Sequence, residues 1–96
     1  MKGLNFDKDK ISEFCRRHDM VFLGLFGSFA RGDQKLGSDV DFIVRFSKPK
    51  SLLELVEIEL ELTEFLGRKV DLLTEASISP YLRDRILSET RAIYEG

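Results

Sequence analysis

The arrangement of apolar and polar positions predicts four β-strands. Residues 21–26 are apolar throughout, which is typical of a strand in the middle of a sheet. Residues 39–46 alternate, so their side chains are expected to separate onto two faces. The two sets are Val40, Phe42 and Val44 on one face and Asp39, Asp41 and Ile43 on the other. A shorter strand at 69–74 is sorted in the same way, with Asp71 facing away from Val70 and Leu72, and a last strand is expected at 92–94.

Helical spacing of apolar residues predicts further elements between these strands. Ile11, Phe14 and Cys15 recur at helical spacing within residues 7–18. A helix from Pro80 to about Ser88 begins with Ser79 as the cap and proline at the first helical position. A single helical turn is expected at 28–31, and a loop at 35–37.

The segment 51–66 is ambiguous. Residues 57–62 alternate glutamate with Ile or Leu, which taken alone indicates a strand. We predict a helix, because the segment spans 16 residues, is rich in Leu and Glu, and has only two β-branched apolar residues, Val56 and Ile58.

Wound as a helix, this segment has one narrow acidic stripe and is apolar nearly everywhere else. The stripe consists of Glu54, Glu57, Glu61 and Glu64. One face of a sheet cannot cover so wide an apolar surface, so we expect a second contact, with another copy of the chain or with a partner protein. This contact is predicted to include some of Leu55, Ile58, Leu62 and Phe65.

Composition limits the class of protein. A chain of 96 residues is expected to form one domain, residues 1–96, and the order of elements predicts an α/β fold with a small mixed β-sheet and helices mainly on one side. One cysteine, no signal peptide and no long apolar segment favour the cytoplasm and argue against a membrane protein. The net charge of −2 disfavours general nucleic-acid binding.

Candidate chemistry lies at the Gly27–Ser28 turn and in the strand that follows. Ten residues separate Ser28 from Asp39, and Asp39 and Asp41 are expected on one face. Carboxylates held together in this way repel each other, and a divalent cation turns the repulsion into ligation. With Asp71 on the same face of a neighbouring strand, three acids can hold two Mg²⁺ ions roughly 3.5–4 Å apart. The pattern indicates phosphoryl or nucleotidyl transfer.

Each of these residues also has a less specific interpretation. Each aspartate can stand at a strand end without a role, Gly27 can serve a turn, and Ser28 can cap a helix. Three acids on one face beside a Gly-Ser turn favour the metal site. The turn lacks the Gly-Lys-Ser/Thr of a P-loop, which argues against an ATPase of that type. Arg31 either contacts phosphate or pairs with one of the acids to hold the turn.

These residues resemble the DNA-polymerase-beta-like nucleotidyltransferase superfamily. The matching motif is Gly27-Ser28, ten residues, Asp39-Val40-Asp41, and a later single Asp71 on a strand. Within the superfamily, residues 21–94 are similar to the minimal nucleotidyltransferase (MNT) type, which also ends in a Pro-Tyr-Leu-Arg helix and a terminal Ile-Tyr. Both occur here, at 80–83 and 93–94.

The resemblance implies the polymerase-beta-like fold and the transfer of AMP from ATP to a hydroxyl, with release of pyrophosphate. It also implies that Asp39, Asp41 and Asp71 bind two Mg²⁺ ions. Asp71 would help to deprotonate the acceptor, and Gly27, Ser28 and Arg31 would contact the nucleotide.

The expected acceptor lies on another chain, because 96 residues leave no room for an acceptor-binding domain. In the MNT type this other chain is typically a HEPN-domain protein, often a ribonuclease toxin, which implies an antitoxin that adenylylates its toxin. Two alternatives stay open. The chain can be a binding module that neutralises its partner by occlusion, or a subunit of a two-chain transferase that acts on a small molecule.

Overall fold

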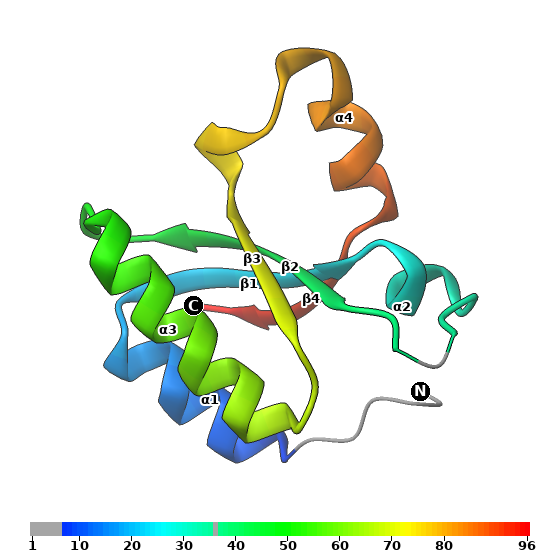
Figure 1. The fold of residues 1–96 in the computed structure, drawn as a ribbon. Coiled ribbons are helices and arrows are strands. Elements are labelled where there is room, and N and C mark those ends of the chain that lie inside the picture. The colour runs from blue at the N-terminus through cyan, green and yellow to red at the C-terminus, as the bar shows by residue number, and fades with distance from the viewer. Residues whose placement is uncertain (1–6, 36) are drawn as a thin grey trace.

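The computed structural model describes residues 7–35 and 37–96, which form a four-stranded sheet in the order β3-β2-β1-β4 (Figure 1). The strands are β1 (Met20–Phe26), β2 (Val40–Phe46), β3 (Val70–Thr74) and β4 (Arg91–Glu95). Central β1 runs antiparallel to both β2 and β4, whereas β3 is parallel to β2. The sheet is therefore mixed, as predicted, and β1 lies in its middle.

Helices α1 (Lys8–Arg17) and α3 (Leu52–Leu66) lie together on one side of the sheet, and α4 (Pro80–Glu89) stands on the other (Figure 1). The single turn α2 (Ser28–Arg31) follows β1, and a 3₁₀ turn, η1 (Glu75–Ser77), precedes α4. No residue of α4 is fully buried, so the helices that build the core lie mainly on one side, as predicted. The loop predicted at 35–37 includes Leu36, which lies outside the described residues.

The core fills the space between the sheet and the first and third helices. From β2 it takes Val40, Phe42 and Val44, the apolar face that the alternation predicts. From α1 it takes Ile11, Phe14 and Cys15. Burial raises the pKa of the Cys15 thiol to about 12, so this cysteine stays protonated at neutral pH and acts as a small apolar side chain.

The segment 51–66 is a helix, but two of the four residues predicted for its second contact are buried in the core. Ile58 and Leu62 are in the core, at 3% and 0% exposure, and Leu55 is half-buried; only Phe65, at 37%, is exposed. The exposed apolar side is formed instead by Leu52, Leu53, Val56 and Leu60. The sequence could not choose between these faces, because the helix is apolar around most of its circumference.

Polar side chains of α3 close the outer edge of β3. The Thr63 hydroxyl accepts a hydrogen bond from the Val70 N–H at 3.1 Å, and a Glu59 carboxylate oxygen accepts one from the Leu72 N–H at 2.9 Å. Both N–H groups belong to the edge strand of the sheet, where they would otherwise lack a strand partner. This contact explains why Glu59, alone among the glutamates of α3, lies outside the acidic stripe.

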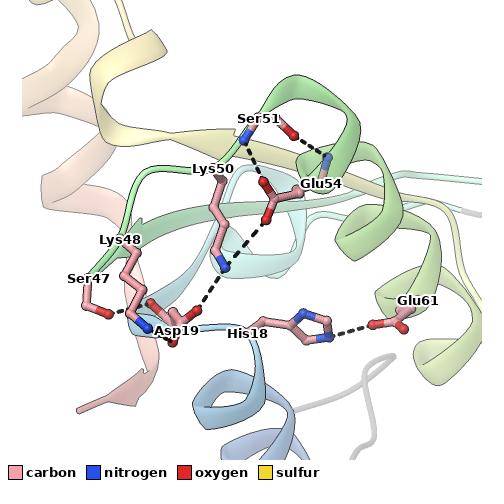
Figure 2. A network of polar contacts seen from close by, with 8 residues as sticks. All are labelled: His18, Asp19, Ser47, Lys48, Lys50, Ser51, Glu54 and Glu61. Carbon is pink, nitrogen blue, oxygen red and sulfur yellow. Dashed lines mark hydrogen bonds and ion pairs between the residues drawn. The ribbon is translucent and has the colours of Figure 1, made fainter.

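A polar network joins the start of β1 to the loop before α3 (Figure 2). Lys50 Nζ lies 2.9 Å from a carboxylate oxygen of Asp19, and the Ser47 N–H donates to the Asp19 carbonyl at 2.9 Å. Lys50 is only 11% exposed and also approaches Glu54, at 3.8 Å. The hydrogen bond from Lys50 is the main reason why the pKa of Asp19 is lowered below its usual value of 3.8.

A second polar contact in this region joins α1 to α3. His18 Nε2 lies 2.6 Å from a carboxylate oxygen of Glu61 (Figure 2). Within the described chain this nitrogen has no hydrogen-bond partner, so the contact with Glu61 is a close approach of the two polar groups without hydrogen-bond geometry. None of the described helices has the length and apolar character to cross a lipid bilayer.

Candidate active site

Two of the three predicted acids stand side by side on neighbouring strands. Asp41 is the register partner of Asp71 in the parallel pair of β2 and β3, whose backbones lie about 4.8 Å apart. Asp39 immediately precedes β2. We call Asp39, Asp41 and Asp71 the acid rim. Their place follows from the strand alternation, which turns the neighbouring apolar residues toward the core and these acids to the opposite face.

The Gly27 turn lies directly against Asp41. Phe26, the last residue of β1, is the register partner of Asp41, so the turn that follows crosses the end of the acid rim. A Cβ atom on Gly27 would overlap Asp41 Oδ2, and the backbone of Gly27 has φ 76° and ψ −152°. Both facts require glycine here, because a side chain would strike the carboxylate and strain the backbone.

Ser28 is the first residue of α2 and follows this glycine. The turn is closed by the Arg31 N–H, which donates to the Gly27 carbonyl at 3.1 Å. In the described part of the chain the Ser28 hydroxyl makes no hydrogen bond. The structure therefore brings Gly27 and Ser28 to the acid rim with a hydroxyl that is free to bind another group.

The charge of Asp41 is poorly compensated. Its pKa is raised above the usual 3.8, first by burial and then by the negative charges of Asp71 and Asp39, while Arg31 opposes the shift. An ionised carboxylate in this position gains from a nearby cation, since a cation removes both the repulsion and the cost of desolvation. The oxygen-only donor set of the acid rim fits a hard divalent ion such as Mg²⁺.

The carboxylates do not converge on one point. Among the described residues, no three Asp, Glu, His or Cys side chains are gathered closely enough to hold a metal ion as they stand. Asp39 instead leans toward Lys69, with 3.9 Å between its Oδ2 and the lysine Nζ. Both side chains are well exposed, at 42% and 79%, so the pair is weak and a small rotation of Asp39 can release it.

Arg31 pairs with two acids outside the acid rim. Its Nε lies 3.3 Å from Asp33 Oδ2, and its Nη1 lies 3.5 Å from Glu89 Oε2 at the end of α4. These contacts tie α2 to α4 and hold the turn. A phosphate contact by Arg31 stays a prediction.

Sequence reasoning missed two residues near the acid rim. Lys69 stands two positions before Asp71 and shares its face, so the period of the strand could have identified it. Glu89 could not have been found in this way, because it is far from Arg31 along the chain and only the placement of α4 brings them together.

Comparison with known proteins assigns the chain to a family. Residues 8–93 match the family model described as nucleotidyltransferase domain. A protein of Methanocaldococcus jannaschii, whose name proposes protein adenylyltransferase activity, is 48% identical over 87 residues, which cover 91% of this chain and 94% of the relative. The protein adenylyltransferase MntA of Thermococcus cleftensis is 40% identical over 77 residues, covering 80% of this chain and 78% of its own.

Two solved structures with the same fold are of toxin–antitoxin complexes. A toxin–antitoxin structure with AMP-PNP has a TM-score of 0.79 at 24% identity, covering 95% of this chain and 75% of that chain. A structure of tri-AMPylated Shewanella oneidensis HEPN toxin with MNT antitoxin has a TM-score of 0.70 at 21% identity, covering 93% and 70%. At these identities the likeness establishes the fold alone. The family match and the relatives show that this chain belongs to the nucleotidyltransferase family, and its likeness to a solved structure described as a proposed minimal nucleotidyltransferase, 34% identical with a TM-score of 0.77, makes it one of the minimal members.

Proposed function

We propose that this nucleotidyltransferase moves AMP from ATP to a hydroxyl group of a HEPN-domain protein, in a Mg²⁺-dependent reaction that silences a toxin. The observation that carries the proposal is the placement of Asp41 between Asp71 and the Gly27–Ser28 turn. In this arrangement the Asp41 carboxylate, which a bound cation would stabilise, lies beside a turn in which the Ser28 hydroxyl makes no hydrogen bond within the described chain. The names of the relatives and of the toxin–antitoxin structures support the choice of AMP and of the acceptor.

In the proposed reaction the acid rim, Asp39, Asp41 and Asp71, would hold the metal. When bound, Mg²⁺ neutralises charge on the phosphates and activates the acceptor oxygen. Ser28 and the backbone after Gly27 hold the outer phosphates in place, and Asp71 assists removal of the acceptor proton. A bond forms from the acceptor oxygen to the α-phosphorus of ATP while the α–β bridging bond breaks and pyrophosphate leaves.

Incorporation of label from ATP tests the proposal. The chain is incubated with Mg²⁺, ATP labelled at the α-phosphate, and a purified HEPN-domain protein as the acceptor. We expect the HEPN-domain protein to become labelled, and Asp41→Asn to lower the rate by at least about 10²-fold. The control is Asp84→Asn, the same change at an exposed acid of α4, which should keep the native rate.

The alternative of neutralisation by occlusion makes the opposite prediction. If the HEPN-domain protein is bound and inhibited without any label, and Asp41→Asn inhibits it equally well, the transfer mechanism is wrong. Loss of label when Mg²⁺ is replaced by a chelator supports the metal assignment, and an unchanged rate contradicts it.

A further inference from the structure

We propose that the exposed apolar side of α3 binds an amphipathic helix of the acceptor protein, one whose apolar stripe is flanked by Lys or Arg. We call this side the α3 ridge; it consists of Leu52, Leu53, Val56 and Leu60. The inference rests on the proposed function only in taking the acceptor as the partner. The chemistry of the partner surface follows from the residues of this chain alone.

The α3 ridge is apolar surface that the core does not use. Its side chains are 78%, 68%, 43% and 59% exposed, in the order Leu52, Leu53, Val56 and Leu60. At 3.6 residues per turn they fall within an arc of about 100°, a width typical of the contact face of a helix. The same helix already packs against the sheet through Ile58 and Leu62, so the ridge is a second, separate apolar face.

Negative charge lines one border of the α3 ridge. Glu57 and Glu64 follow the ridge around the helix, and both are exposed. Within the described residues neither forms an ion pair, unlike Glu54 and Glu61, which meet Lys50 and His18. A partner helix with basic residues beside its apolar stripe would complement these two free charges.

A second copy of the chain fits the α3 ridge poorly. In an antiparallel two-fold pairing of α3 with α3, each border of one helix faces the same border of the other. Glu57 and Glu64 of both copies would then lie opposite one another, and like charges in an interface are unfavourable.

The position of the α3 ridge suits an acceptor-binding surface. Helix α3 lies on one side of the sheet (Figure 1). Strand alternation turns Asp41 and Asp71 to the other side, away from the core residues of β2 and β3. A helix of two to three turns seated on the ridge therefore leaves the acid rim open to the nucleotide. The rest of the acceptor protein can extend around the β3 edge toward the rim.

Binding of a synthetic helix tests the chemistry of the surface without the acceptor. The probe is a fluorescent peptide with a Leu stripe flanked by Lys, compared with the same peptide flanked by Glu. In anisotropy titrations we expect the Lys-flanked peptide to bind, and the double variant Val56→Gln, Leu60→Gln to weaken binding at least about tenfold. Leu82→Gln on α4, at another exposed leucine, is the matched control and should bind normally.

Three results of the peptide experiment overturn the inference. They are equal binding by the double variant, equal binding of the Glu-flanked peptide, and self-association of the native chain in sedimentation that the double variant abolishes. The last result assigns the ridge to a second copy. Circular dichroism confirms that the exposed substitutions leave the fold intact.

The acceptor protein then separates this inference from the proposed function. We expect the double variant to bind ATP with Mg²⁺ normally but to lose co-elution with the HEPN-domain protein, whereas Asp41→Asn keeps co-elution and loses labelling. Normal co-elution of the double variant with the HEPN-domain protein contradicts the α3 ridge as the binding surface, even if labelling occurs. Loss of co-elution in the double variant, with no labelling by the native chain, supports the ridge and defeats the transfer mechanism.

Discussion

Asp19 and Asp41 both lie near the start of a central strand, but the charges around them differ: positive side chains surround Asp19, and mainly negative ones surround Asp41. Asp19 accepts a hydrogen bond from the nearly buried Lys50, and its pKa is lowered (Figure 2). Asp41 lies near two other acids, only the positive charge of Arg31 opposes their effect, and the pKa of Asp41 is raised. A carboxylate whose charge is balanced within the chain strengthens the fold. One whose charge is left unbalanced weakens the fold and is available to bind a cation from solution.

Substitution of Gly27 should have the largest effect, because it disturbs the site around Asp41 directly. Gly27→Ala places a Cβ against the Asp41 carboxylate, in a backbone region that costs a non-glycine residue about 1–3 kcal/mol. We expect loss of nucleotide-binding heat in calorimetry together with a lower Tm. Gly32→Ala is the control, because its φ of +80° brings backbone strain but no atom lies within 4 Å of the added Cβ. Equal loss of binding in both variants would show that strain alone is responsible.

The contribution of Asp19 to the stability of the fold should depend on pH. Because the pKa of Asp19 is lower in the folded chain than its usual 3.8, the ionised group stabilises the fold above that pH and loses this effect as the pH falls below it. Asp19→Asn should therefore lower Tm at pH 7 and have little effect near the folded pKa. Asparagine tolerates the φ of +60° at this position, so the change isolates the charge. A Tm deficit that is the same at every pH would contradict the argument.

Asp41→Asn should raise the stability of the fold, whereas Asp19→Asn lowers it, and its effect should be the smallest of the three. Asp41→Asn removes a carboxylate whose pKa is raised in the folded chain. With a chelator present, the variant should therefore be as stable as the native chain at low pH and more stable than it as the pH rises above 3.8. The gain is about 1 kcal/mol at most because the site is open to solvent, which corresponds to less than about 8 °C in Tm. Thermal melts measure it. A clear loss of stability instead would assign Asp41 a structural role.

The comparison also shows what the sequence can predict. The alternation in 39–46 and 69–74 predicts which face carries Asp41 and Asp71, because strand period leaves one choice once the apolar residues are buried. It does not predict that Lys50 pairs with Asp19, because that contact depends on how the loop before α3 folds back to β1. The α3 ridge was missed for another reason. A helix that is apolar on most sides offers several faces, and only the packed sheet selects one.

The hydrogen bonds from Val70 and Leu72 to α3 also affect how the protein can assemble. An open edge strand is a template for another strand, either from a partner or from a neighbouring misfolded chain. At β3 two outward N–H groups are already occupied by Thr63 and Glu59, so this edge resists strand addition. The opposite edge, β4, lies at the far side of the sheet. Aggregation by edge pairing is therefore disfavoured at the strand that carries Asp71, and the acid rim is kept clear of added strands.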